Sequence, residues 1–220
     1  VNIPSVPPEV LPQLQPYLGL AERMGFFQSQ LIDAGIEQIT IEYCGDVANL
    51  STAPLTVAVL KGLFAPILES VVNAVNAPFI AKKRGIEAKE IKSSDAGEYT
   101  SLIRIHIQAG KQSHQLAGTL YHKKEPRIVE SNAYPVEVIP EGFMLMIYNK
   151  DRPGVIGTVG RVLGEQNVNI ARMQCARSKK GENALLIIGL DGLPSQQIIG
   201  TLKQEEDILS VRLVDLTQVR

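Results

Sequence analysis

The sequence lacks an excess of either charge and lacks long apolar runs. Its 220 residues include 22 basic and 23 acidic side chains, for a net charge of −1. The chain has no basic excess to bind a phosphate backbone, so we expect no nucleic-acid partner. No apolar run reaches the roughly 20 residues that a membrane-spanning helix needs, and no charged-then-apolar signal segment opens the chain. We therefore expect no membrane association.

Cysteine and histidine are too sparse for a metal site. Cys44 and Cys175 lie in separate strand-like runs, and we expect both to be free, buried thiols of a cytoplasmic protein. His106, His114 and His122 are spaced eight residues apart without nearby Cys or carboxylate ligands, so we expect no metal site. No Ser-His-Asp or Cys-His arrangement follows from the spacing, and the sequence predicts no catalytic residue.

The first 16 residues are instead rich in proline. They contain five prolines, which disfavour a continuous helix and predict an extended connection that leads into a short helical turn. Because the chain begins with Val1, we expect it to be part of a longer protein, with this segment as a linker. A hydrophobic content of 45% then predicts a folded chain with a substantial core.

Residues 1–140 predict helices on one face of a largely antiparallel sheet, an α+β arrangement. Leu20, Met24, Phe27 and Leu31 recur at helical spacing before Gly35. The predicted helices cover residues 18–35, a segment capped by Ser51 or Thr52 that runs to 68, and 71–84 with an interruption at Pro78. The predicted strands cover residues 36–45, 86–93, 101–108, 114–121 and 127–139, with a hairpin turn at Gly110-Lys111.

Residues 141–220 predict a second domain that follows Pro140-Glu141-Gly142. The segments FMLMIYN, PGVIGTVGRVLGEQ, NIARMQCARS, NALLIIGLD, PSQQIIGTLKQE and ILSVRLVDL give the order β-α-β-β-α-β. This order is typical of the ferredoxin-like fold. The two predicted helices each have one apolar face, formed by Val155, Val159, Val162 and Leu163 and by Ile198, Ile199 and Leu202.

Short polar residues bracket the first helix of this second domain. We place Pro153 at the first helical position, where Gly154, Val155 and Ile156 would present unpaired N–H groups to a carboxylate. Asn149 and Asp151 precede the helix and Asn169 follows it. An amide can bind both a carboxylate and an ammonium group, and an Asp can pair with an ammonium group. The bracket therefore suits a free amino acid, although plain helix capping explains the same residues.

The segment DRPGVIGTVGRVLGEQNVNIARM within this β-α-β-β-α-β pattern resembles the ACT domain, a family of amino-acid-sensing regulatory modules. Four further segments, VNIPSVPPE, YCGDVANLSTAPLTVAVLKGLF, VNAVNAPFIAKKRGI and AGTLYHKKEPRIVE, resemble the C-terminal region of the D-3-phosphoglycerate dehydrogenase family. In that family they correspond to the intervening, allosteric substrate-binding domain. The resemblance covers essentially the whole chain.

This resemblance implies a non-catalytic regulatory region of an enzyme that oxidises 3-phosphoglycerate with NAD in L-serine synthesis. The catalytic and NAD-binding domains would lie outside the chain, which itself needs no cofactor; GTVGRVLG falls within a predicted helix and not after a strand. L-serine is then expected between paired ACT domains of a dimer or tetramer. The matching residues are Asn149, Asp151, Pro153, Gly154, Val155 and Asn169. Some relatives carry His at the position of Asn149.

The resemblance also implies an anion site in the first domain. Arg127 matches one basic position of that site, and Lys124 is a further candidate, whereas Ile139 stands at a second basic position. Two alternatives remain. The β subunit of an iron–sulfur L-serine dehydratase has a similar size and related domains but carries a Ser-Ser-His-Thr segment, which is not found here. A ligand-sensing transcription regulator would need a helix-turn-helix and a basic face.

Overall fold

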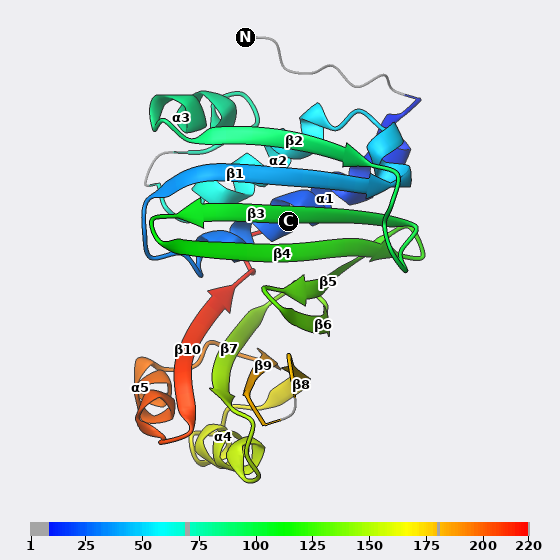
Figure 1. Cartoon of the computed structure of the whole chain (residues 1–220). Helices are drawn as coiled ribbons and strands as arrows, with labels where there is room; N and C mark the ends of the chain where they lie inside the picture. Colours follow the sequence, from blue (N-terminus) through cyan, green and yellow to red (C-terminus); the bar gives the residue numbers. More distant parts are fainter. Residues whose placement is uncertain (1–8, 69–70, 180, 220) are drawn as a thin grey trace. The chain divides into compact units, whose positions relative to one another are not determined.

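The structure, a computed structural model, describes residues 9–68, 71–179 and 181–219 (Figure 1). They form two compact units: the second covers Ala133–Gln218, and the first covers the described residues up to Asn132 together with Val219. The boundary that the sequence predicts, near residue 140, lies in the loop between β6 and β7. Part of the expected proline-rich connection, residues 1–8, lies outside the described residues. No helix among the described residues is long and apolar enough to cross a membrane.

The first unit combines helices and strands as predicted. Its elements are α1 (Leu11–Ser29), β1 (Ile36–Gly45), a 3-10 helix η1 (Asp46–Asn49), α2 (Ala53–Phe64), α3 (Ala77–Lys83), β2 (Glu87–Ser93), β3 (Ser101–Ala109), β4 (Gln112–Tyr121) and β5 (Glu125–Ser131). The strands are hydrogen-bonded in the order β2-β1-β3-β4-β5. β1 and β2 are parallel, and the other neighbouring pairs are antiparallel.

The first helix differs from the prediction at both ends. α1 begins at Leu11, so residues 11–16 are helical and not extended, and it ends at Ser29, before Gly35. Pro12 lies in the first turn, where its missing N–H has no helical partner to lose. Pro16 forfeits one backbone hydrogen bond, which the burial of Leu20 and Met24 outweighs.

Two other helix starts also depart from the sequence pattern. Thr52 precedes α2 but does not cap it, because its hydroxyl donates to Glu90 Oε2 at 2.8 Å. The helix predicted from residue 71 begins only at Ala77, with Pro78 in its first turn, so the expected interruption is a fresh start. The last predicted strand of the first domain divides into β5 and β6 (Tyr134–Val138) at Asn132, which has a φ of 53°.

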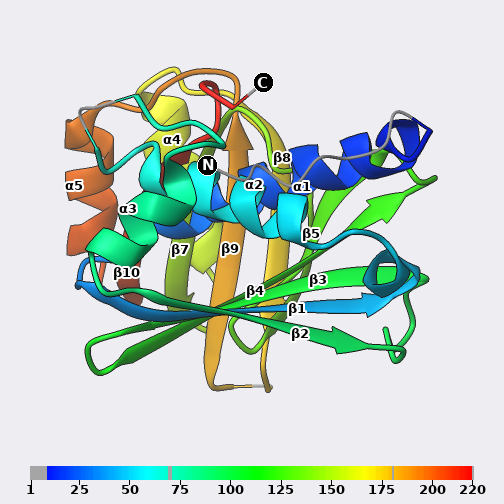
Figure 2. The same ribbon diagram turned by 90° about the horizontal axis from the view of Figure 1, so that it is seen from above.

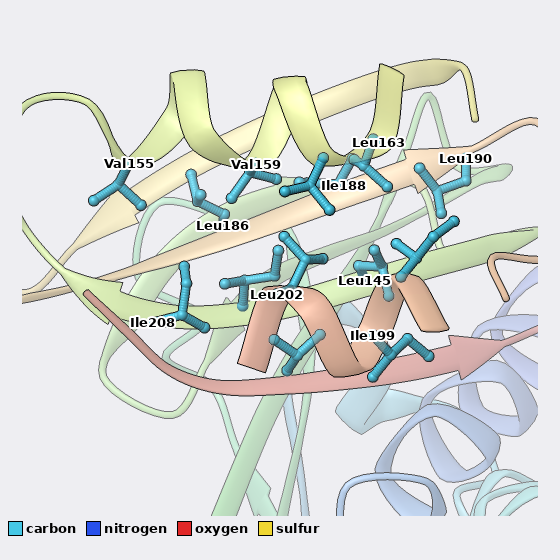
Figure 3. Packing of buried hydrophobic residues seen from close by; sticks show 14 residues of the cluster. Leu145, Val155, Val159, Leu163, Leu186, Ile188, Leu190, Ile199, Leu202 and Ile208 are labelled. Atoms are coloured by element: carbon cyan, nitrogen blue, oxygen red, sulfur yellow. The ribbon is translucent and has the colours of Figure 1, made fainter. Parts of the chain in front are cut away.

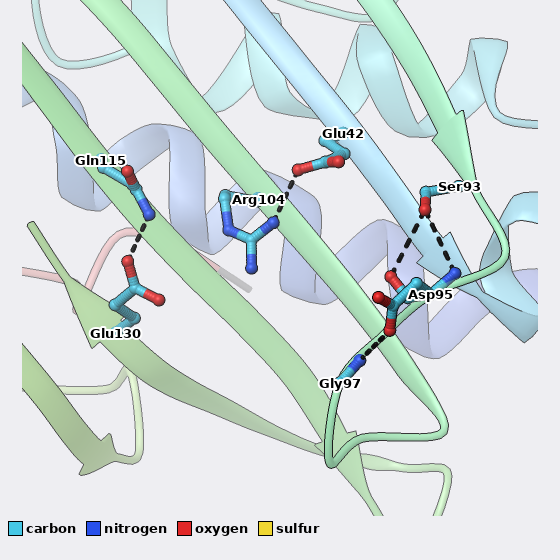
Figure 4. Close-up of polar contacts among 7 residues, drawn as sticks. All are labelled: Glu42, Ser93, Asp95, Gly97, Arg104, Gln115 and Glu130. Atoms are coloured by element: carbon cyan, nitrogen blue, oxygen red, sulfur yellow. Dashed lines mark hydrogen bonds and ion pairs between the residues drawn. The ribbon is translucent and has the colours of Figure 1, made fainter.

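The helices α1 and α2 cover one face of the first sheet (Figure 2). Alternate residues of the central strands, including Ile39, Ile41, Ile103 and Ile105, are fully buried, as the period of two predicts. The opposite face carries polar pairs (Figure 4). Arg104 Nη1 donates to Glu42 Oε2 at 2.6 Å, and Gln115 donates to Glu130.

The second unit is a ferredoxin-like domain, as predicted. Its remaining elements are β7 (Phe143–Lys150), α4 (Val155–Glu165), β8 (Ile170–Arg177), β9 (Asn183–Leu190), α5 (Gln196–Gln204) and β10 (Ile208–Asp215). The four-stranded sheet has the order β10-β7-β9-β8, and every neighbouring pair is antiparallel. The predicted apolar faces of both helices are buried against it: Val159, Leu163 and Leu202 contribute to the core in Figure 3.

Candidate functional site

The loop between β7 and α4 differs from the expected helix start. Gly154 is the N-cap, with a φ of 97°, and the first helical residue is Val155. Pro153 therefore precedes the helix and does not occupy its first position. The left-handed backbone of Gly154 makes the turn into the helix, which a side chain would oppose. A Cβ at Gly154 would meet nothing within 4 Å, so a ligand can approach this backbone closely.

The first turn of α4 can attract an anion. The N–H groups of Val155 and the two residues after it have no carbonyl partner within the helix, as at every helix start. They lie at the positive end of the helix dipole. Gly154 and Ile156 are exposed while Val155 is buried. The turn thus offers backbone donors, with Val155 anchoring it to the core.

Asn149 lies beneath this turn and has an unused acceptor. The side chain is 3% exposed, and Nδ2 donates to the carbonyl of Lys150 at 2.7 Å. Among the described residues, Oδ1 has no hydrogen-bond partner. Strand alternation places Asn149 on the face of Leu145 and Ile147, the face that α4 covers. A buried amide oxygen without a partner costs free energy that a ligand donor would recover.

Asp151 connects this loop to β8. Its Oδ2 accepts from Arg177 Nη1 at 3.2 Å and from the backbone N–H of Gly181 at 3.0 Å. The sequence analysis did not single out Arg177. A sequence signal for it did exist. In the predicted β-α-β-β-α-β order, the strand after the first helix ends at the same end of the sheet as Asp151, and Arg177 is a cation at the end of that strand.

Asn169 lies at the opposite end of the sheet from Asn149 and Asp151. Its Nδ2 donates to Asp191 Oδ2 at 2.6 Å. In the sheet register, the start of β8 is level with Leu190, and its end is level with Ala184 and Asn149. Seven residues of strand separate the two levels, roughly 23 Å at 3.3 Å per residue. Within one chain the structure thus assembles the first five predicted residues and leaves Asn169 apart.

The strand that joins the two ends, β8, is an edge strand. Beside it α4 presents an open face, since a Cβ at Gly157, Gly160 or Gly164 would meet nothing within 4 Å. Cys175 of β8 is exposed, so the expectation of two buried thiols is wrong for this cysteine. The reason is its place on an edge strand that no helix covers. Both cysteines are free, and Cys44 is buried as expected.

The predicted anion residues of the first unit lie near a pocket of about 750 Å³. Lys124 lines this pocket with His122 and Lys123, whose φ angles of 49° and 62° form a left-handed turn. Arg127 is not among the lining residues. Its Nη2 donates to Glu125 Oε2 at 2.8 Å, and its guanidinium lies 5.2 Å from the centre of the Tyr121 ring.

Two features bear on metal and dinucleotide binding: the grouping of potential metal ligands and the position of the glycines in GTVGRVLG. The described residues contain no group of three or more His, Cys, Asp or Glu side chains placed to hold a metal ion. The glycines of GTVGRVLG lie inside α4, whereas a dinucleotide-binding turn requires glycines between a strand and a helix. The segment GTVGRVLG therefore lacks the arrangement of a dinucleotide-binding turn.

Comparison with known proteins identifies both units. Residues 13–132 match the family model of the D-3-phosphoglycerate dehydrogenase intervening domain, and residues 143–207 match that of the ACT domain. A D-3-phosphoglycerate dehydrogenase of Methanocaldococcus jannaschii is 36% identical over 98% of this chain and 41% of its own length. That of Bacillus subtilis is 34% identical over 98% of this chain and 41% of its own length.

A third relative is the D-3-phosphoglycerate dehydrogenase of Synechocystis, which is 38% identical over 87% of this chain and 35% of its own length. The chain thus spans about two fifths of the length of the curated relatives it matches. These matches do not favour the serine dehydratase alternative. The chain belongs to the D-3-phosphoglycerate dehydrogenase family, of which it contains the intervening domain and the ACT regulatory domain.

Proposed function

We propose that the ACT domain binds L-serine between two copies of the chain and thereby regulates a D-3-phosphoglycerate dehydrogenase by feedback. One observation carries the proposal: the predicted ligand residues lie at opposite ends of the edge strand β8. When an edge strand pairs antiparallel with its own copy across a two-fold axis, its start lies beside the end of the partner strand. Asn169 of each copy would then complete the loop that contains Asp151 of the other.

The residues at each end suit a small amino acid. The backbone donors after Gly154 attract a carboxylate, and Asp151 can pair with an ammonium group. Oδ1 of Asn149 is a buried acceptor for a donor of the ligand, and its lack of a partner among the described residues supports a ligand there. The open glycine face of α4 allows a partner to approach beside the site.

The regulatory effect requires two arrangements of the copies. A ligand that bridges two chains favours whichever arrangement places both halves of its site together, and it inhibits only if the active arrangement separates them. In this proposal the parent enzyme oxidises 3-phosphoglycerate with NAD in domains outside this chain, as a homodimer or homotetramer. Free cysteines suit the cytoplasm as its compartment.

The direct test is calorimetric titration of the chain with L-serine, D-serine and phosphate. We expect saturable heat with L-serine and at least a tenfold loss of affinity, about 1.4 kcal/mol, in Asn169→Ala. Sedimentation should show that L-serine strengthens self-association. Absence of heat with L-serine at millimolar concentration would show that the proposal is wrong and that the loop residues only cap the helix.

A complementation test addresses the division of the site between two chains. At an L-serine concentration that just saturates the unsubstituted chain, Asp151→Ala and Asn169→Ala should each bind little L-serine by themselves. When the two variants are coexpressed, about half of the dimers are mixed and each mixed dimer has one intact site, so about one quarter of the sites should bind L-serine. Circular dichroism of each variant confirms its fold. Failure to recover any binding would show that both residues act within one chain.

A second candidate function is an anion site in the first unit, for which we propose Lys124 and Arg127 as ligands. The clustering of His122, Lys123 and Lys124 around one pocket supports it, while Asp46 and Glu98 in the same lining weaken the positive potential. The test is titration with inorganic phosphate of the chain and of Lys124→Ala and Arg127→Ala. Saturable heat that either substitution reduces severalfold would support the site, and unchanged heat in both would exclude these residues.

A further inference from the structure

We propose that Arg177 binds the carboxylate of the amino acid, and that Asp151 positions it. This inference rests on the proposed function and assigns a specificity to the same site. In this chain the position before α4 holds the acidic side chain of Asp151, which repels a carboxylate, and Asn149 carries no charge and has a buried acceptor, Oδ1, without a partner among the described residues. A carboxylate therefore needs a cation beyond the helix start, and Arg177 is in place to supply it.

The sheet register brings Arg177 level with Asn149. Asn149 of β7 pairs with Ala184 of β9, and Ala184 pairs with Arg177 of β8. Residues that pair directly across antiparallel strands point to the same face, so all three side chains lie on the face that carries α4. Neighbouring strands are about 4.8 Å apart, which separates the Cα atoms of Asn149 and Arg177 by roughly 10 Å. The small side chain of Ala184 lies between them.

Arg177 has donors to spare. Its side chain is 57% exposed, and among the described residues it makes one hydrogen bond, from Nη1 to Asp151. A guanidinium carries five N–H donors in a planar fork that fits a carboxylate. Asp151 therefore holds one side of the fork and leaves the other free for the ligand.

Three other cations of this unit pair with other carboxylates. Lys150 and Arg152 both pair with Asp207, at 3.1 and 3.0 Å, and Asp207 directly precedes β10, the opposite edge of the sheet. Arg172 of β8 pairs with Glu141 at 2.7 Å. It adjoins Met173, which packs on the core side, and so points to the other face.

The position of Arg177 also suits the bridged site. It ends the edge strand β8, and antiparallel pairing of two β8 strands would bring Asn169 of the partner beside it. One ligand could then have its carboxylate on Arg177 and its ammonium group between Asp151 and the partner copy. This arrangement predicts selection for zwitterionic amino acids over amides or amines.

The test compares L-serine with L-serinamide, whose carboxylate is replaced by a neutral amide, by calorimetry on the whole chain. We expect the unsubstituted chain to prefer L-serine by at least tenfold. Arg177→Gln should lower the affinity for L-serine at least tenfold and the affinity for L-serinamide little. The ratio of the two affinities should then fall close to one. Arg177→Lys should retain part of the preference. Arg172→Gln is the matched control, since Arg172 lies on the same strand with a similar exposure of 59%.

The outcomes separate the two proposals. If the unsubstituted chain binds L-serine and Arg177→Gln keeps the full preference over L-serinamide, Arg177 does not bind the carboxylate and the inference is overturned. If Arg177→Gln lowers the affinity for both ligands equally, the arginine only supports the loop, and the inference is likewise overturned. If the unsubstituted chain does not bind L-serine at all, the proposed function itself fails.

Discussion

The helices of the two units use glycine in opposite ways. In the first unit Gly25 of α1 and Gly62 of α2 lie where the helices touch: an added Cβ would come within 2.1 Å of the carbonyl oxygen of Val59 or Glu22. In the second unit Gly157, Gly160 and Gly164 of α4 face open space. The first pair lets two backbones pack closely, whereas the second set packs against nothing within its own unit.

This contrast extends to other groups. The first unit buries Cys44 and half-buries the Glu42–Arg104 pair, while the second exposes Cys175 and the Arg161–Glu165 pair. Glycine inside a helix lowers its stability by roughly 0.5–1 kcal/mol relative to alanine. Three such residues in α4 therefore lower the stability of the helix, and the self-association proposed above would give their open surface a use. The comparison teaches that the glycines of the first unit serve packing between its own helices, whereas those of α4 leave a surface on which a second copy can pack.

The largest effect on stability is expected from adding a methyl group at a glycine that packs against the neighbouring helix. Gly25→Ala should lower the free energy of unfolding by about 3 kcal/mol, because backbone on both helices must move to admit the methyl group. The control, Gly160→Ala, should instead raise stability by up to about 1 kcal/mol. Urea denaturation followed by circular dichroism measures both. Equal changes in the two variants would remove the contrast between the helices.

Removing one ion-paired arginine from each unit should give a smaller difference in stability than the two glycine substitutions. Arg104→Ala leaves the Glu42 carboxylate, whose side chain is 25% exposed, without its charged partner, and should destabilise the first unit by about 2 kcal/mol. Arg161→Ala removes an exposed (i, i+4) pair with Glu165 and a second pair with Glu205, and should cost about 0.5–1 kcal/mol. The same denaturation experiment compares them. A larger loss for Arg161→Ala would contradict the expectation that the partly buried pair contributes more stability than the exposed one.

The two cysteines should differ in reactivity. Burial raises the pKa of the Cys44 thiol, and the neighbouring Glu42 raises this pKa further, so its reactive thiolate is scarce. Cys175 is exposed and should react with iodoacetamide at least tenfold faster, as mass spectrometry of the folded chain would show. L-serine should slow the reaction of Cys175 if β8 is covered on binding. Faster labelling of Cys44 would mean that the first unit opens readily.

The smallest effect concerns pH. Burial lowers the pKa of His106 and Arg104 lowers it further, against opposing effects of Glu42 and Glu130. Because the unfolded chain then binds a proton more readily, the stability of the first unit should fall as pH drops below the ordinary histidine pKa of about 6.5. His106→Gln should reduce this slope in denaturation measured from pH 7 to 5. An unchanged slope would assign it to other groups.

Local patterns predicted most elements of the second unit. Val159 and Leu163 mark the buried face of α4, and the order β-α-β-β-α-β follows from alternating periods in the chain, because each depends on neighbours a few residues away. Helix starts were less predictable. The hydroxyl of Thr52 donates to Glu90 and does not cap the helix, and Gly154 is the N-cap, so Pro153 precedes the first turn. Contacts with residues distant in the sequence and the local backbone conformation decide these starts, and the local sequence does not reveal them.

The residue types of the candidate site were evident from the sequence, since Asn149, Asp151 and Asn169 stand out around one helix. Their grouping depended on tertiary structure. The antiparallel register sets Asn169 at the far end of β8 and brings Arg177 to Asp151, and the strand order leaves Cys175 on an edge. These features arise from pairing between strands that are distant in the chain, which local periodicity does not encode.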